Sequence, residues 1–378
     1  MKIILVTEYL APENRPYFGG TNARTINFAK QLVKKNDVHI ITTLTDGGKE
    51  NEDYEGVNIH RIGKKRTYSQ RGEFSQRYQF NAEVASEISK LHPDVVDGSG
   101  FVSWHGCYKG SKKIGIPVIA TVHEVWQGDW VKNTGLISGV AGHFLEKTFL
   151  NYKFDKYIAV SNFTKEKLIQ KLGISHEKIA MVYNGIDLKQ YNAIKVKKKY
   201  QNPTIVTICR LVHYKRVDDL LRALQILKAD IPDVKLQIIG SGPEENHLKC
   251  LSKDLGIEDD VTFLGKFAKN DDVIRTLKMS HIFALPSIVE GFGMVVLEAM
   301  AAGTPYVASD IPPIREVTNG GIGGLLFKPT DYHELASKLR TLLNDEAQQK
   351  NSRKTSYVTR KNTGNDPGCN RHRRAETR

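Results

Sequence analysis

The stretch IFALPSIVEGFGMVVLEAMAAGTP, residues 282–305, decides the fold of this chain. Its apolar start, Ile282–Leu285, predicts a buried strand, and an acidic loop then leads into a helix that ends at Gly303. Glu290 and Glu298 lie in this unit with seven residues between them. Helix N-termini favour phosphate, and carboxylates accept hydrogen bonds from sugar hydroxyls. The unit therefore indicates a sugar-nucleotide site, and the alternative is an ordinary turn with Glu298 on a helix surface.

Short β-rich runs alternate with helical patterns on both sides of this stretch. Strands are expected at residues 2–7, 38–42, 57–61, 94–97, 117–122, 157–160, 180–183, 204–209, 235–239, 261–264, 282–285 and 306–309. Helices are expected at residues 21–34, 104–114, 163–172, 217–228, 244–255 and 334–343, and residues 71–91 form a polar amphipathic segment. This alternation predicts an α/β fold with two doubly wound parallel-sheet domains, which face each other across a cleft at the carboxyl ends of their strands.

A charged stretch near residue 195 divides the chain, which is too long for one ordinary core. It contains four lysines and ends at Pro203, which is typical of a linker. We therefore predict a first domain at residues 1–190, a linker at 191–202 and a second domain at 203–345. Residues 346–378 are expected to form a basic, disordered tail, because no amphipathic stripe runs through them.

Composition excludes several classes of protein. The four cysteines fall in no metal or redox spacing, which favours a cytoplasmic protein, and no signal peptide or uncharged apolar run of about 20 residues occurs. The net charge is +13, which is compatible with a phosphorylated substrate or an anionic membrane surface. Nucleic acid is not expected as a partner, because no binding motif accompanies the charge.

One segment of the first half suggests a further hypothesis, a contact with a membrane surface. Trp126, Trp130 and Lys132 precede the apolar run 136–140, and aromatic and basic residues together suit a membrane interface. The alternative is that these residues line an acceptor cleft or belong to the core.

Several residues stand where a parallel strand is expected to end. Gly19 and Gly20 follow the first strand and open the first helix, where a backbone without side chains can approach an anion. Arg210 and Lys215 follow the first strand of the second half, and together they can grip a diphosphate. Each pair alone is also compatible with a surface loop.

Three further motifs occupy equivalent places. His123 ends the strand 117–122, where an imidazole can orient or polarise an incoming group. Gly240 and Gly242 form a tight turn into a helix, which could shape a nucleotide pocket or only connect two elements. The turn 184–187 is interpreted as structural.

Taken in order along residues 1–345, these motifs resemble the retaining GT-B glycosyltransferases of family four. The resemblance implies transfer of a hexosyl unit from a UDP- or GDP-sugar to a hydroxyl of a glycan, lipid-linked or small-molecule acceptor. It implies that His123, Arg210, Lys215 and Glu290 are catalytic, and that Gly19, Gly20, Gly240, Gly242, Phe292, Gly293, Met294 and Glu298 bind the donor. It implies no metal and no cofactor, because cationic side chains and helix termini would neutralise the leaving diphosphate.

The family resemblance also assigns a role to each group. Arg210 and Lys215 would hold the diphosphate, Glu298 the ribose hydroxyls and Glu290 the sugar hydroxyls. The leaving phosphate itself would take the acceptor proton. The chain departs from the family pattern at Cys209, where a glycine is usual, and in its tail, where the family has an apolar closing helix. The tail motivates an alternative, a catalytically impaired sugar-nucleotide-binding protein, and a GT-B epimerase or phosphorylase is a second one.

Overall fold

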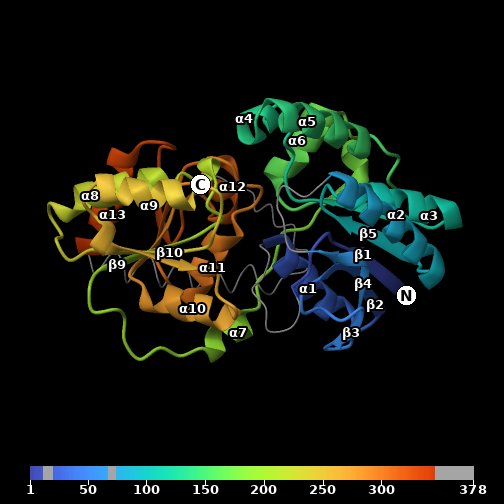
Figure 1. Ribbon diagram of the computed structural model, residues 1–378, viewed down its shortest axis with the longest axis horizontal. Helices are drawn as coiled ribbons and strands as arrows, with labels where there is room; N and C mark the ends of the chain where they lie inside the picture. The colour runs from blue at the N-terminus through green and yellow to red at the C-terminus, as the bar shows by residue number, and fades with distance from the viewer. Residues whose placement is uncertain (12–19, 67–73, 345–378) are drawn as a thin grey trace, which may run out of the picture.

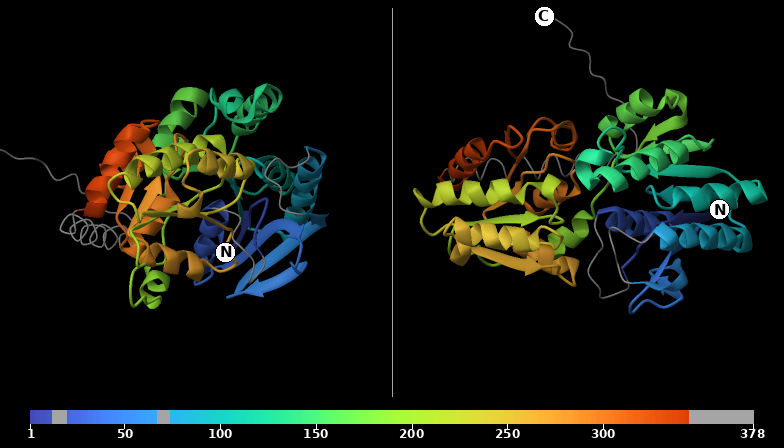
Figure 2. Two further views of the ribbon diagram at one scale, coloured as in Figure 1. Left: turned by 60° about the vertical axis from the view of Figure 1, so that its left-hand side comes forward. Right: turned by 45° about the horizontal axis from the view of Figure 1, so that its top comes forward.

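Two α/β domains lie side by side in the computed structural model, which describes residues 1–11, 20–66 and 74–344 (Figure 1). Each domain is built on one sheet with helices on both faces, and two further views show the same arrangement (Figure 2). The predicted fold class, two doubly wound parallel-sheet domains, is confirmed.

The first domain contains an eight-stranded sheet in the order β3-β4-β2-β1-β5-β6-β7-β8. All its pairs are parallel except β3–β4, because this pair is an antiparallel hairpin at the sheet edge. Its strands are β1 (Lys2–Val6), β2 (Asp37–Thr45), β3 (Asn51–Tyr54), β4 (Val57–Arg66), β5 (Val95–Ser99), β6 (Val118–Val122), β7 (Lys156–Ala159) and β8 (Ile179–Met181). Its helices are α1 (Gly20–Leu32), α2 (Phe74–Leu91), α3 (Trp104–Ile114), α4 (Trp130–Thr134), α5 (Leu136–Leu150) and α6 (Asn162–Leu172).

The second domain contains a six-stranded, entirely parallel sheet in the order β11-β10-β9-β12-β13-β14. Its strands are β9 (Thr204–Ile208), β10 (Lys235–Ile239), β11 (Val261–Gly265), β12 (Ile282–Leu285), β13 (Tyr306–Ser309) and β14 (Gly324–Phe327). Its helices are α7 (Leu188–Ala193), α8 (Val217–Lys228), α9 (Glu245–Asp254), α10 (Asn270–Met279), α11 (Met294–Ala302), α12 (Pro312–Val317) and α13 (Tyr332–Asn344). Short 3₁₀ turns lie at His176–Lys178, His213–Lys215 and Glu258–Asp260.

The strands are apolar on both faces, because each sheet is buried between two layers of helices. In the second domain Ile205 belongs to the core cluster under α8 and α13, and its neighbour Val206 belongs to the cluster under α11. In the first domain Ile4 packs with α2 and α3, and Leu5 packs with α1. Side chains alternate between the faces of a strand, so both faces must be apolar for both layers to pack.

Several elements were not predicted. The helix α5 is apolar on most sides, so no polar stripe marks its period. The hairpin strand β3 is polar, as an exposed edge strand can be, and β14 follows a cluster of glycines that reads as a loop. The helices α4, α7, α10 and α12 were also missed. The strand expected at residues 180–183 ends at Met181.

Part of the predicted linker at residues 191–202 packs on the second domain. Tyr191 and Ile194 are buried in a small core with Ile274 of α10 and Ala301 of α11. The Lys278 ammonium also donates to the Ile194 carbonyl at 2.7 Å. The predicted tail and Gly19 lie outside the described residues. In the part of the chain that is described, no helix is both long and apolar enough to cross a bilayer.

Candidate active site

A large cavity of about 530 Å³ lies between the two domains, within the size range of ligand sites. Residues that directly follow strands contribute to it from both sheets, so it lies at the carboxyl ends of the strands. Of the predicted site residues in the described segments, those that line it are Gly20, His123, Arg210, Lys215, Gly240, Glu290, Phe292, Gly293, Met294 and Glu298. Gly242 does not line it, because the turn packs this residue against the backbone of Leu211.

The loop after β12 brings its backbone close to the first domain. A side chain at Gly291 would lie 2.0 Å from the carbonyl oxygen of His123, so only glycine fits there. Gly293 has a φ of +88° and caps the start of α11, a conformation that favours glycine. This turn opens the first N–H groups of α11 toward the cavity, whose wall includes Gly293 and Met294.

Lys215 and Glu290 form an ion pair at the base of this loop, with 2.7 Å between Nζ and Oε1. Burial alone would lower the pKa of Lys215, but the carboxylates of Glu290 and Glu124 outweigh it and raise that pKa above its ordinary value. Lys215 therefore remains a cation at all working pH values. The pair holds the ammonium group at the cavity, where a diphosphate can reach it.

Two more cations line the same side of the cavity. Arg210 follows β9, and Lys266 follows β11, the edge strand of the sheet. Burial and the nearby Arg210 guanidinium lower the pKa of Lys266. Positive charge therefore gathers on this wall, which is suited to an anionic ligand. Lys266 was not predicted, although its place just after a strand end is the signal that found Arg210.

Glu298 projects from the second turn of α11 into the cavity. Burial raises its pKa from 4.5 to about 7, and no neighbouring cation lowers it. Within residues 1–11, 20–66 and 74–344, this carboxyl group has no ion pair or hydrogen bond. A half-buried acceptor of this kind, facing the cavity, is suited to hydroxyl donors from a ligand.

His123 is a neutral imidazole at the end of β6. Burial, together with the Arg24 guanidinium, lowers its pKa to about 3. Its Nε2 lies 3.0 Å from the Ser99 hydroxyl, which orients the ring from the end of β5. A neutral imidazole can exchange hydrogen bonds with hydroxyl groups but does not supply a positive charge.

Besides Lys266, the structure adds Glu124 and Asn184 to the residues predicted for the site. Glu124 follows His123 directly, lines the cavity and accepts a hydrogen bond from the Trp126 indole N–H. Asn184 belongs to the turn 184–187, which also lines the cavity and is therefore more than a connection. The Asn184 side chain is buried, and its Oδ1 has no hydrogen-bond partner in the described part of the chain.

Direct contacts hold the two domains together beside the cavity. The Glu316 carboxylate of α12 accepts hydrogen bonds from the backbone N–H groups of Asn162 (2.6 Å) and Phe163 (3.1 Å), which begin α6. The Ser161 hydroxyl donates to the Gly291 carbonyl at 3.0 Å. A carboxylate at a helix N-terminus is favourable, so this contact stabilises the apposed domains.

Two family models match the chain. Residues 18–190 match "Glycosyltransferase Family 4", and residues 189–360 match "Glycosyl transferases group 1". An uncharacterized glycosyltransferase of Haemophilus influenzae is 28% identical over 333 residues, which are 86% of this chain and 87% of the relative. The N-acetyl-alpha-D-glucosaminyl L-malate synthase of Bacillus anthracis is 36% identical over 180 residues, 46% of each chain.

Solved structures of the same architecture cover nearly the whole chain. Sucrose-phosphate synthase from Thermosynechococcus elongatus superposes with a TM-score of 0.82 at 18% identity, covering 96% of this chain and 95% of that one. Anabaena Alr3699/HepE in complex with UDP and glucose has a TM-score of 0.74 at 20% identity, with the same coverage. The fold is thus GT-B, as predicted. Because the two family models together span residues 18–360, the chain belongs to the group 1, family 4 glycosyltransferases.

Proposed function

We propose that this glycosyltransferase transfers a hexosyl unit from a nucleotide-diphosphate sugar to an acceptor hydroxyl with retention of anomeric configuration. One observation carries the proposal: the cations Arg210, Lys215 and Lys266 and the isolated carboxyl group of Glu298 line one cavity between two domains. A nucleotide diphosphate supplies the matching groups, because its phosphates are anions and its ribose hydroxyls are donors.

The proposed donor lies with its diphosphate on Arg210 and Lys215 and its ribose on Glu298. Glu290 then holds hydroxyls of the transferred sugar, and the backbone around Gly20 and Gly293 approaches the phosphate. Two relatives' names support the donor class: HepE is described with UDP-glucose, and a Corynebacterium glutamicum mannosyltransferase is GDP-mannose-dependent. Both UDP- and GDP-sugars therefore remain in the proposal.

In the proposed reaction the bond from the anomeric carbon to the diphosphate oxygen breaks through an oxocarbenium-like state. Negative charge grows on the leaving phosphate, and the ammonium of Lys215 and the guanidinium of Arg210 stabilise it without a metal. The departing phosphate takes the proton of the attacking acceptor hydroxyl on the same face of the sugar. His123 orients the reacting sugar by hydrogen bonding, which fits its neutral ring.

A donor panel tests this function. The protein is incubated with UDP-glucose, UDP-galactose, UDP-N-acetylglucosamine and GDP-mannose, and binding and nucleotide release are measured with and without added glycosides. We expect at least one donor to bind and to release its nucleotide, and proton NMR of the product to show the donor's anomeric configuration. An inverted product would refute retention, and a folded protein that binds none of the donors would refute the function.

We further propose that the acceptor is a glycan or a lipid-linked glycan at the cytoplasmic face of an anionic membrane. Exposed apolar residues support the membrane contact: Leu136, Val140 and Phe144 are 71%, 57% and 70% exposed and lie four residues apart on α5. Lys132 of α4 and Lys147 of α5 are also exposed, and the two helices lie at the top of the first domain in Figure 1. An apolar stripe flanked by lysines suits an anionic bilayer surface.

The two tryptophans do not take part in this stripe. The Trp126 and Trp130 indoles donate to Glu124 and Glu146. Trp126 lines the small cavity between the domains, whereas the Trp130 ring packs against Phe101 and Gly142 of the first domain. The alternative that these residues line the cleft or belong to the core therefore fits both rings, Trp126 in the cleft and Trp130 in the packing of the first domain. The apolar run at residues 136–140 instead fits an interface.

Sedimentation with vesicles of phosphatidylglycerol and phosphatidylcholine tests the contact. We expect the protein to sediment with anionic vesicles at low salt, and the double substitution Leu136→Glu/Phe144→Glu to abolish this. The substitution Tyr78→Ser removes an equally exposed ring, 72% exposed, elsewhere on the first domain and serves as the control. Recovery of the unmodified protein in the supernatant at low salt would refute membrane contact.

A further inference from the structure

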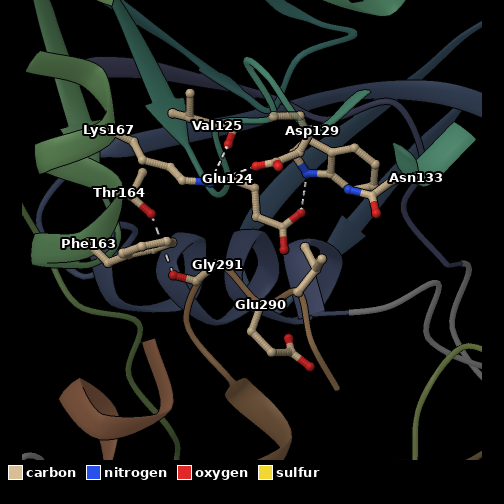
Figure 3. A pocket seen from close by; sticks show the side chains of 11 residues that line it. Glu124, Val125, Asp129, Asn133, Phe163, Thr164, Lys167, Glu290 and Gly291 are labelled. Atoms are coloured by element: carbon tan, nitrogen blue, oxygen red, sulfur yellow. Dashed lines mark hydrogen bonds and ion pairs between the residues drawn. The ribbon is translucent and has the colours of Figure 1, made fainter. Parts of the chain in front are cut away.

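A second, much smaller cavity adjoins the large one at the point where the domains meet (Figure 3). Its volume is about 20 Å³, which is room for one group of the size of a water molecule or a hydroxyl. It shares Glu124, Glu290 and Gly291 with the large cavity. On its other side it is closed by α4 and α6, through Asp129, Asn133, Phe163, Thr164 and Lys167. A ligand in the large cavity can therefore place one substituent here.

The side-chain amide of Asn133 forms part of the wall of this cavity. Its side chain is only 8% exposed, and it lines the cavity from the last turn of α4. Among the described residues, neither its Nδ2 nor its Oδ1 has a hydrogen-bond partner. Buried amide groups are normally paired, so this one is prepared for a ligand. Because the amide offers both N–H donors and a carbonyl acceptor, the matching group is one that both donates and accepts, such as a hydroxyl.

Glu124 provides a second acceptor across the same cavity. Its Oε2 accepts from the Trp126 indole, and its Oε1 has no partner in the residues that the structure describes. Figure 3 shows the Glu124 carboxylate between Asp129 above and Glu290 below. A hydroxyl in the cavity could thus donate to Glu124 while it accepts from Asn133.

The charges around the cavity decide against an anionic ligand. Three carboxylates surround it, those of Glu124, Asp129 and Glu290. Two ammonium groups oppose them, because Lys167 pairs with Asp129 at 3.3 Å and Lys215 pairs with Glu290 at 2.7 Å. Lys167 is the one cation among the described residues that line this cavity, and Asp129 already pairs with it, so a carboxylate or phosphate group of a ligand would find no free positive charge here. A neutral hydroxyl is the group that fits both the charge and the unpaired amide.

Aromatic rings extend this polar cavity toward the large one. The centroid of the Trp126 ring lies 5.2 Å from that of Trp130. It lies 5.6 Å from the ring centroid of Tyr214 in the second domain, and these two rings meet edge to face. Such rings can lie against the C–H face of a sugar, while polar groups beside them bind its hydroxyls. The combination of aromatic wall, carboxylate and amide is suited to a pyranose ring.

We propose that this small cavity recognises the acceptor: Asn133 and Glu124 hold a hydroxyl of a neutral sugar acceptor that neighbours the attacking one. Asn133 is then a residue that determines acceptor specificity. This inference rests on the proposed function for the identity of the large cavity. It concerns a different ligand, however, and acceptor binding can be measured without a donor.

The experiment uses methyl α-D-glucopyranoside, methyl α-D-mannopyranoside and their monodeoxy derivatives as probe acceptors. Their binding is followed by saturation-transfer NMR without donor, and nucleotide release is followed with the donor that the panel identifies. Variants Asn133→Ala and Asn133→Leu are compared with Asn151→Ala, because Asn151 is exposed on α5's end in the same domain. Melting temperatures verify folding, and Asn133→Leu replaces the unpaired amide with an apolar group of similar size, which preserves packing.

We expect a probe glycoside to bind and one monodeoxy derivative to bind at least about tenfold more weakly, since a site built for a hydroxyl rejects its absence. Both Asn133 variants should lose that discrimination but keep their affinity for the donor. The Asn151→Ala variant should discriminate between the probes as the unmodified protein does. The inference is overturned if no probe binds the unmodified protein. It is also overturned if the Asn133 variants distinguish the glycoside from its deoxy derivative as well as the unmodified protein does. Probe binding through Asn133 without any transfer would instead refute the proposed function and leave this site in place.

Discussion

The carboxyl group of Glu298 should make the stability of the protein depend on pH near neutrality. Its folded-state pKa of about 7 lies above the ordinary value of 4.5, because burial disfavours the ionised form. Between these pH values the folded state retains a proton that the unfolded chain has released. The stability that this proton preserves is complete below pH 4.5 and is lost as the pH rises through 7. At 1.36 kcal/mol per pKa unit, the loss amounts to about 3 kcal/mol at pH 8 but only about 1 kcal/mol at pH 5.

The substitution Glu298→Gln removes this titration and keeps the shape of the side chain. We expect the variant to gain stability over the unmodified protein, by about 2 kcal/mol more at pH 8 than at pH 5. Urea unfolding followed by circular dichroism at both pH values measures the difference. Glu258→Gln is the matched control, because Glu258 is exposed in the same domain. Equal gains at pH 5 and pH 8 would contradict the assignment of an unpaired carboxyl group whose pKa is raised to about 7.

The same group should couple donor binding to pH. If ribose hydroxyls donate to the ionised carboxylate, binding must first remove its proton. The affinity for UDP-glucose should then fall about tenfold from pH 8 to pH 6, as the ionised fraction falls through the pKa of about 7. Calorimetry in buffers of different ionisation enthalpy should detect the released proton. A Glu298→Gln variant with an equally steep pH dependence would refute a contact between Glu298 and the donor.

Two more substitutions test the site and its closure. Lys215→Met should lower kcat about 100-fold or more, because it removes a cation from the leaving phosphate and leaves Glu290 unpaired; Lys253→Met, at an exposed lysine of the same domain, should not. Wild-type turnover in the Lys215 variant would disprove its proposed role. Glu316→Gln should weaken the contact between α12 and α6 by about 1–2 kcal/mol, since a neutral amide binds two backbone N–H groups less strongly than a carboxylate does. Small-angle scattering should then report a larger radius of gyration without ligand, and an unchanged profile would show that Glu316 does not control closure.

Much of the architecture follows from local patterns in the sequence. The strand Ile282–Leu285 and the helix Val217–Lys228 have the bounds that were predicted, because apolar runs and a helical period each reflect one buried layer. The positions of Arg210 and Lys215 after a strand, and of Glu298 in a helix, were also readable. In a parallel sheet, the residues that follow the carboxyl ends of the strands all lie at the same edge. The topology of the sheet therefore brings these side chains close together.

Contacts between the domains could not be read in this way. Nothing in the sequence near Glu316 indicates that it binds the start of α6, more than 150 residues away in the chain. Nor does the segment around Trp126 indicate that its ring turns to the cleft while Leu136 faces outward. These choices depend on how two separately folded domains approach each other, which no short-range period encodes.

The sequence by itself determined the two sheets and the residues that gather at the strand ends, because each depends on local apolar pattern and chain order. Only the tertiary structure decided that Glu124 joins the pair of Lys215 and Glu290, that Asn133 is buried without a partner, and that part of the segment 191–202 packs on the second domain. The reason is physical: burial and charge pairing are properties of the space between elements, and that space exists only after the elements have packed.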